Sequence, residues 1–115
     1  MNIKQFNEKL VNAFSAANKK IAKRLDFNFF DGTLYFTIRS KKEGNVNCIN
    51  ASILALKPAG KPHCIELSEV WVGYDQEGFC WSDNMGGKII DCAGLKVGSV
   101  IDLIVSELNA RVKEV

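Results

Sequence analysis

The sequence contains no long apolar run, a single histidine and only two prolines among its 115 residues. A helix that spans a bilayer needs about 18 or more consecutive apolar residues, so we predict no membrane segment. Residues 1–6 also lack the continuous apolar stretch of a signal peptide. We therefore expect a cytoplasmic protein. One histidine excludes every serine or metal mechanism that requires two.

The four cysteines, Cys48, Cys64, Cys80 and Cys92, are widely spaced and form no C-x-x-C pair. In a cytoplasmic protein such cysteines are reduced and pack as small apolar side chains. Structural zinc sites draw their ligands in close pairs, so we expect neither a metal nor any other cofactor. His63 directly precedes Cys64, but neighbouring residues on a strand point to opposite faces. This arrangement does not predict a Cys–His nucleophile.

No other motif predicts an enzyme. Residues 94–99 place two glycines before an expected helix, yet they lack the glycine-lysine ending of a phosphate-binding P-loop. The acidic residues within 66–83 have polar neighbours, whereas a carboxylate tuned for acid catalysis needs apolar surroundings that raise its pKa. We therefore expect no catalytic residues.

Charge is unevenly distributed along the chain. Residues 1–62 contain eleven Lys and Arg against four Asp and Glu, and residues 63–115 contain four against nine. This asymmetry predicts either one basic and one acidic surface, or two halves that interleave and neutralise each other. The basic residues within 19–24 lie at the C-terminal end of an expected helix, where cations complement the helix dipole. We prefer that explanation to nucleic-acid binding.

Two amphipathic helices are predicted at the ends of the chain. The first covers residues 3–23, with Asn2 as N-cap and Gln5 as its reciprocal partner. The second covers residues 99–113, with Ser99 as N-cap. Apolar residues repeat every three or four positions in both, as in Ile3, Phe6, Leu10, Phe14, Ala17 and Ile21 of the first.

Antiparallel strands are predicted between the helices. Asp31-Gly32 favours a two-residue turn that joins strands 25–30 and 33–39, with Phe27 opposite Phe36. Apolar residues alternate in both strands, which predicts a sheet with one dry face and one largely wet face. The remaining expected strands are 46–56, 64–74, 79–82 and 88–91, separated by turns at 57–62, 75–78 and 83–87.

These elements predict an α+β fold in one domain over residues 1–115. An N-terminal helix, a meander sheet of five or six antiparallel strands and a C-terminal helix form a two-layer sandwich. The apolar phase shifts near Ser68-Glu69, which predicts a β-bulge or a break there. Beyond that point we expect Val70, Val72, Tyr74, Phe79 and Trp81 on one face, and Trp71, Gly73, Cys80 and Ser82 on the other.

The candidate site consists of aromatic residues on the uncovered face of this sheet. Trp71, Tyr35 and Phe30 are expected there, and Glu69 and Glu77 lie near Trp71 in the sequence. Exposed Trp and Tyr anchor protein interfaces, and an acidic aromatic patch suits a basic protein partner. The opposing interpretation is that the C-terminal helix or a second copy covers Trp71, which would then belong to the core.

We therefore expect a small non-catalytic binding module that recognises another protein, or its own copy in a homodimer, through the exposed sheet face. Inhibitors, immunity-type proteins and accessory proteins of mobile elements share this size. The alternative is a curved sheet that encloses an apolar pocket for a small molecule, lined by Phe27, Phe36 and Trp81. A third hypothesis is RNA binding through Tyr35 and the lysines of 41–42, which the acidic segment 66–83 disfavours.

Overall fold

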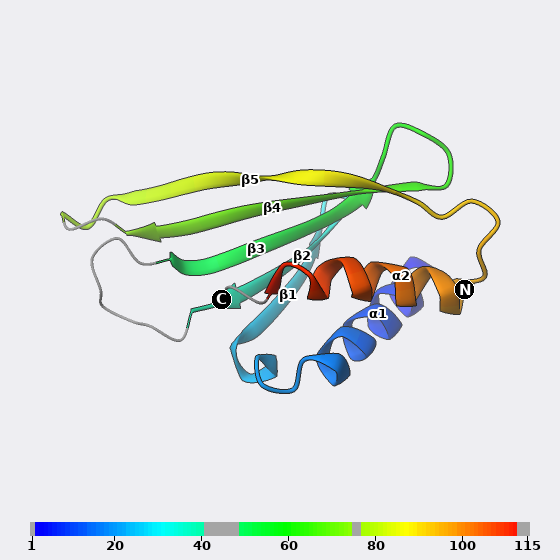
Figure 1. Cartoon of the computed structure of the whole chain (residues 1–115), viewed down its shortest axis with the longest axis horizontal. Coiled ribbons are helices and arrows are strands. Elements are labelled where there is room, and N and C mark those ends of the chain that lie inside the picture. The colour runs from blue at the N-terminus through cyan, green and yellow to red at the C-terminus, as the bar shows by residue number, and fades with distance from the viewer. Residues whose placement is uncertain (1, 41–48, 75–76, 113–115) are drawn as a thin grey trace.

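A computed structural model describes residues 2–40, 49–74 and 77–112. It contains α1 (Ile3–Ala17), a short 3-10 helix (Ala22–Arg24), β1 (Leu25–Phe30), β2 (Thr33–Arg39), β3 (Ile49–Pro58), β4 (Cys64–Tyr74), β5 (Cys80–Asp91) and α2 (Val97–Asn109). The strands form one antiparallel sheet in the order β1-β2-β3-β4-β5. Both helices lie on the same side of this sheet (Figure 1). The predicted α+β meander is confirmed, with five strands.

The β1–β2 hairpin has the predicted ends and register. Asp31 and Gly32 have φ values of 50° and 79°, as a two-residue turn of this type requires. Phe27 pairs with Phe36 and Phe30 pairs with Thr33. On β2, alternate residues Leu34, Phe36 and Ile38 are buried, so this side of the sheet faces the helices.

The first helix begins as predicted but ends six residues earlier, at Ala17. Asn2 and Gln5 form the reciprocal capping box. At the other end, the side-chain amide of Asn18 donates to the carbonyl of Phe14 and to the side chain of Asn109 on α2. Asn18 thereby competes for helix carbonyls and stops the helix. The predicted basic last turn of α1 is wrong, because the basic residues 19–24 follow the helix.

The second helix begins two residues before the predicted start. Its N-cap is Lys96, which makes no side-chain capping bond, and Ser99 lies in the first turn. The predicted N-cap role of Ser99 is therefore wrong. In the described part of the chain, neither helix has the length and apolarity that crossing a bilayer requires.

The β5 strand is continuous through residues 83–87, where we predicted a turn. Ser68 pairs with Gly87 and Val70 pairs with Asn84, so one extra residue of β5 is accommodated opposite Glu69. The backbone N–H of Gly86 donates to Oδ1 of Asn84 at 2.8 Å, and Gly86 has a φ of 95°. These glycines form a bulge within the strand rather than a chain reversal. An irregularity near Ser68 is thus present in the β4–β5 pairing, but the extra residue lies on β5, so the predicted shift of phase within 64–74 is wrong.

The core lies between the helix layer and the sheet. Phe14 of α1 contacts Phe36 of β2 edge to face, with ring centroids 5.1 Å apart. Around this pair pack the buried aliphatic residues of both layers, which are Leu10, Val11, Ile21, Leu34, Ile38, Leu54, Leu56, Leu67, Ile90, Ile101, Ile104, Leu108 and Val112.

An ion-paired carboxylate joins α2 to β5. Glu107 accepts a hydrogen bond from Lys88 Nζ at 2.6 Å and another from Arg111 Nη1 at 3.2 Å. The bond from Lys88 is the main cause that holds the pKa of Glu107 below its ordinary value, although burial acts in the opposite direction. A lowered pKa in the folded state means that ionised Glu107 favours folding.

We therefore predict that the stabilisation from Glu107 is present at neutral pH and is lost as pH falls through its folded-state pKa. Unfolding by urea, followed by circular dichroism across an acid pH series, measures this. The free-energy gap between wild type and Glu107→Gln should close in acid. Glu8→Gln, at an exposed position of α1, is the control. A gap that stays constant with pH would contradict the prediction.

Candidate functional site: an apolar pocket between the helices and the sheet

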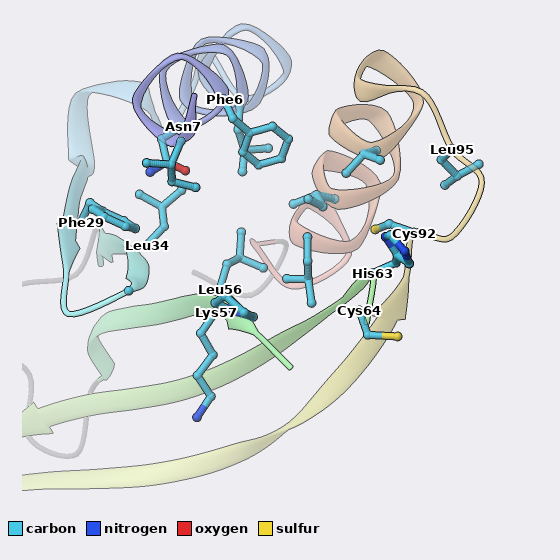
Figure 2. A pocket seen from close by; sticks show the side chains of 17 residues that line it. Phe6, Asn7, Phe29, Leu34, Leu56, Lys57, His63, Cys64, Cys92 and Leu95 are labelled. Atoms are coloured by element: carbon cyan, nitrogen blue, oxygen red, sulfur yellow. The ribbon is translucent and has the colours of Figure 1, made fainter. Parts of the chain in front are cut away.

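The first halves of α1 and α2 and the adjoining end of the sheet line an open pocket of about 490 Å³ (Figure 2). We call it the end pocket. Strands β2, β3 and β4 contribute its floor, and the two helices contribute its roof. Its lining residues are Ile3, Phe6, Asn7, Leu10, Phe29, Gly32, Leu34, Leu56, Lys57, Pro58, His63, Cys64, Ile65, Cys92, Leu95, Val100 and Ile104.

The floor and roof of the end pocket are apolar because of strand register and helix periodicity. Leu34 lies directly opposite Leu56 in the sheet, and both point toward the helices. The side chains of Leu10 and Ile104 extend into the pocket from the buried faces of α1 and α2. All four side chains are buried. A ligand in the pocket would therefore meet a hydrocarbon surface.

The mouth of the end pocket is also apolar, although it is accessible to water. Ile3 is 59% exposed and Phe29 is 47% exposed, and Leu95 on the opposite side is also exposed. Phe29 and Leu95 stand on opposite sides of the opening in Figure 2. Large apolar side chains gathered around a concave site are typical of ligand-binding surfaces.

A few polar groups lie at the edge of the end pocket. The side chain of Lys57 points away from the cavity (Figure 2) and pairs with Glu66 at 3.5 Å. His63 is exposed and has a φ of 58°, and its carbonyl accepts the backbone N–H of Cys92 at 2.8 Å. Asn7 is half-buried on α1. The site thus combines an apolar interior with a sparse polar edge.

The thiol of Cys92 belongs to the apolar wall. Burial raises its pKa, and the nearby Asp91 and Cys64 raise it further. A thiol with a raised pKa stays protonated at neutral pH and is a poor nucleophile. Across residues 2–40, 49–74 and 77–112, no three His, Cys, Asp or Glu side chains are grouped as metal ligands.

The structure separates the aromatic residues that we predicted to share one surface. Tyr35 and Phe30 lie on the side of the sheet away from the helices, which we call the open face. Trp71 pairs with Ser52, which pairs with Ile38, so Trp71 lies on the helix side. The predicted common face is wrong, because β4 keeps its alternation through Glu69 and the bulge falls on β5.

The two acidic residues of the predicted patch are also separated. Glu69 is buried on the helix side and accepts a hydrogen bond from Trp71 Nε1 at 2.9 Å. Glu77 is exposed in the turn between β4 and β5. Trp71 is half-buried, which lies between the two predicted outcomes. The ends of β4 and β5 near Glu77 extend past the helices (Figure 1).

The strand register also changes the face of Trp81, which we predicted on the other side of the sheet from Trp71. Trp81 pairs with Gly73 and therefore joins Trp71 on the helix side, while Val70 and Val72 lie on the open face. Sequence reasoning missed these two valines as open-face residues. The signal that could have identified them is the regular alternation of side chains along residues 64–74. The change of apolar positions near Ser68 concealed it.

The pocket that we predicted has different walls. Phe36 and Trp81 do not line the end pocket, and Phe27 lines a neighbouring groove. Phe36 is instead fully buried in the core. The observed lining combines residues from both helices, several strands and the loops beside them, so no sequence spacing indicates it.

Comparisons with family models, with curated proteins and with solved structures gave no match. Function is therefore inferred from the geometry of the chain.

Proposed function

We propose that the chain is a non-catalytic binding module that holds a small apolar or amphipathic molecule in the end pocket. The observation that carries this proposal is the cavity of about 490 Å³ with an apolar interior and an apolar, exposed mouth. Pockets for small ligands range from about 300 to 1,000 Å³ and are lined mainly by apolar side chains.

Burial of the exposed mouth supplies the driving force for binding. Ile3, Phe29 and Leu95 keep apolar surface in water in the empty state. Each square ångström of apolar surface removed from water contributes about 25 cal/mol. A molecule that fills the interior and covers these side chains therefore gains free energy without any charged contact. Asn7 and His63 at the edge are suited to hold one polar end of an amphipathic ligand.

Two observations support a binding role without catalysis. The Cys92 thiol is protonated at neutral pH because its pKa is raised, and the described polar residues at the mouth are few and dispersed. Cys64, Cys80 and Cys92 are free thiols, as expected of the cytoplasmic location that we propose.

Binding of N-phenylnaphthylamine, a neutral dye that fluoresces in apolar surroundings, tests this function. We expect saturable fluorescence with wild-type protein and at least a tenfold weaker affinity with Asn7→Trp, because the indole would occupy the pocket opening. Asn12→Trp is the matched control, since Asn12 is an exposed residue of the same helix outside the pocket.

Two results would overturn the proposal. One is the absence of saturable binding to the wild type. The other is equal affinity of both tryptophan variants, because the dye would then bind elsewhere on the surface. Circular dichroism establishes that both variants are folded before the titration.

A second candidate function is protein binding through the open face, as the sequence suggested. The favouring observation is an apolar centre of Tyr35, Ile53, Val70 and Val72 on the side of the sheet away from the described helices. Phe30 extends this face at its edge. Paired charges flank the centre, with Asp26–Arg39 at 3.4 Å and Lys57–Glu66 at 3.5 Å. An apolar centre with a polar rim suits a protein partner.

A further inference from the structure

We propose that β1 is a self-association edge, on which β1 of a second copy adds in antiparallel orientation and joins the two sheets into one. The occupant is therefore a second copy of this chain. The proposal depends on the backbone and side chains of β1 and not on a ligand in the end pocket.

The backbone of β1 presents unused hydrogen-bonding groups. In the described sheet β1 has a neighbour on one side, which is β2. Phe30 and Thr33 flank a two-residue turn, so they exchange hydrogen bonds, and the pairing alternates from there. Consequently the N–H and C=O groups of Phe27 and Phe29 point to the free edge. A partner that satisfies such a row must itself be extended.

Three phenylalanine side chains of β1 leave apolar surface in water at this edge. Phe27 is 56% exposed and Phe30 is 68% exposed, and Phe29 lies between them with nearly half its surface in water. Natural edge strands are normally guarded by charges, prolines or bulges. The other edge strand, β5, has such protection, because it contains the Gly86 bulge and the exposed charges Lys88 and Asp91. β1 has neither a bulge nor a proline, and its one charge, Asp26, is paired with Arg39 of the neighbouring strand. This weaker protection favours an edge that is covered in the assembled protein.

A groove of about 450 Å³ runs beside this edge, between α1 and β1. Phe27, Phe29 and Val11 contribute apolar walls, while Lys4 and Glu8 are exposed on its helix side. The groove can therefore receive phenylalanine rings from a partner strand while its polar helix side stays in contact with water.

The charges beside the groove favour a second copy as the occupant. Lys4 and Glu8 are one helical turn apart and lie on the same face of α1. A two-fold axis at β1 reverses the direction of α1 in the second copy, so Lys4 of one copy faces Glu8 of the other. Such a contact is self-complementary, as a symmetric dimer interface must be. With the axis at Asn28, it also pairs Phe27 of one copy with Phe29 of the other.

Sedimentation velocity across a concentration series tests this interface with three matched variants. Phe27→Lys places a charge on the proposed edge, Ile89→Lys places one on the other edge strand, and Val70→Lys places one in the centre of the open face. We expect wild type, Ile89→Lys and Val70→Lys to form dimers. Phe27→Lys should dissociate with a Kd at least tenfold higher.

Hydrogen exchange of the wild type provides a readout that needs no variant. The amides of Phe27 and Phe29 should be protected at concentrations that favour the dimer, and should exchange rapidly on dilution. A wild type that is monomeric at all concentrations would overturn the proposal, even if a different protein were found to bind β1. So would a dimer that Val70→Lys abolishes and Phe27→Lys preserves, which would favour the open face instead.

Discussion

Phe36→Ala is expected to lower the free energy of unfolding by about 3–5 kcal/mol, as for other large aromatic residues removed from a core. Phe36 is fully buried at the centre of β2, opposite Phe27 and Leu54. Its ring contacts Phe14 edge to face at 5.1 Å. The substitution removes this contact and leaves a cavity between the sheet and α1. The cavity persists because the sheet and α1 are held apart by their other contacts and cannot close around it completely.

Urea denaturation followed by circular dichroism measures this loss. Phe30→Ala is the control, because the same side chain is removed from a position that is mostly in water. The control should change the free energy of unfolding by about 0.5 kcal/mol or less. Equal losses in the two variants would contradict the placement of Phe36 between the sheet and the helices.

Gly87→Ala is expected to cost about 1–3 kcal/mol, the range typical of overpacked positions. A Cβ atom at Gly87 would lie 2.7 Å from the carbonyl oxygen of Leu67 on β4. The obstructing atom belongs to the backbone of a paired strand, so no side-chain rotation relieves the clash. The β4–β5 pairing would have to separate locally at the bulge.

Gly60→Ala is the matched control, because nothing lies within 4 Å of a Cβ built there. Chemical denaturation should show a stability close to that of wild type for Gly60→Ala and a clear loss for Gly87→Ala. Hydrogen exchange should then locate the increased opening in β4 and β5. Unchanged stability of Gly87→Ala would show that β5 does not approach β4 as closely as described.

Local signals predicted much of the fold. The ends and register of β1 and β2 follow from Asp31-Gly32 and from the alternation on either side of it. The start of α1 follows from Asn2 and Gln5. Its end could not be predicted in the same way, because Asn18 also bonds to Asn109, which is 91 residues away in the sequence.

The faces of β4 and β5 could not be assigned from apolar pattern alone. The change from Leu67 to Val70 resembles a shift of phase, but the chain simply places apolar residues on both sides of β4. Tyr74 pairs with Cys80 and Gly73 pairs with Trp81, so the register of the β4–β5 hairpin places Trp81 on the face of Trp71. A register that differs by one residue moves every side chain of the strand to the other face.

The end pocket depends on the relative placement of two helices and a sheet. Leu34 and Leu56 were expected to be apolar strand residues, but their position beneath a gap in the helix layer is a tertiary property. Phe29 follows the apolar alternation of its strand and lies on the helix side, but it is only partly covered. Periodicity predicts which residues face a layer, but not how completely that layer covers them.

The central claim is that the end pocket receives an apolar molecule. Its most direct test is a methyl NMR titration with N-phenylnaphthylamine in protein labelled at Ile, Leu and Val. We predict saturable shifts at Leu34, Leu56 and Ile104, which line the pocket, with Ile53 and Val72 on the open face unchanged. Shifts confined to the open face, or unperturbed pocket methyl groups at saturating dye, would contradict the claim.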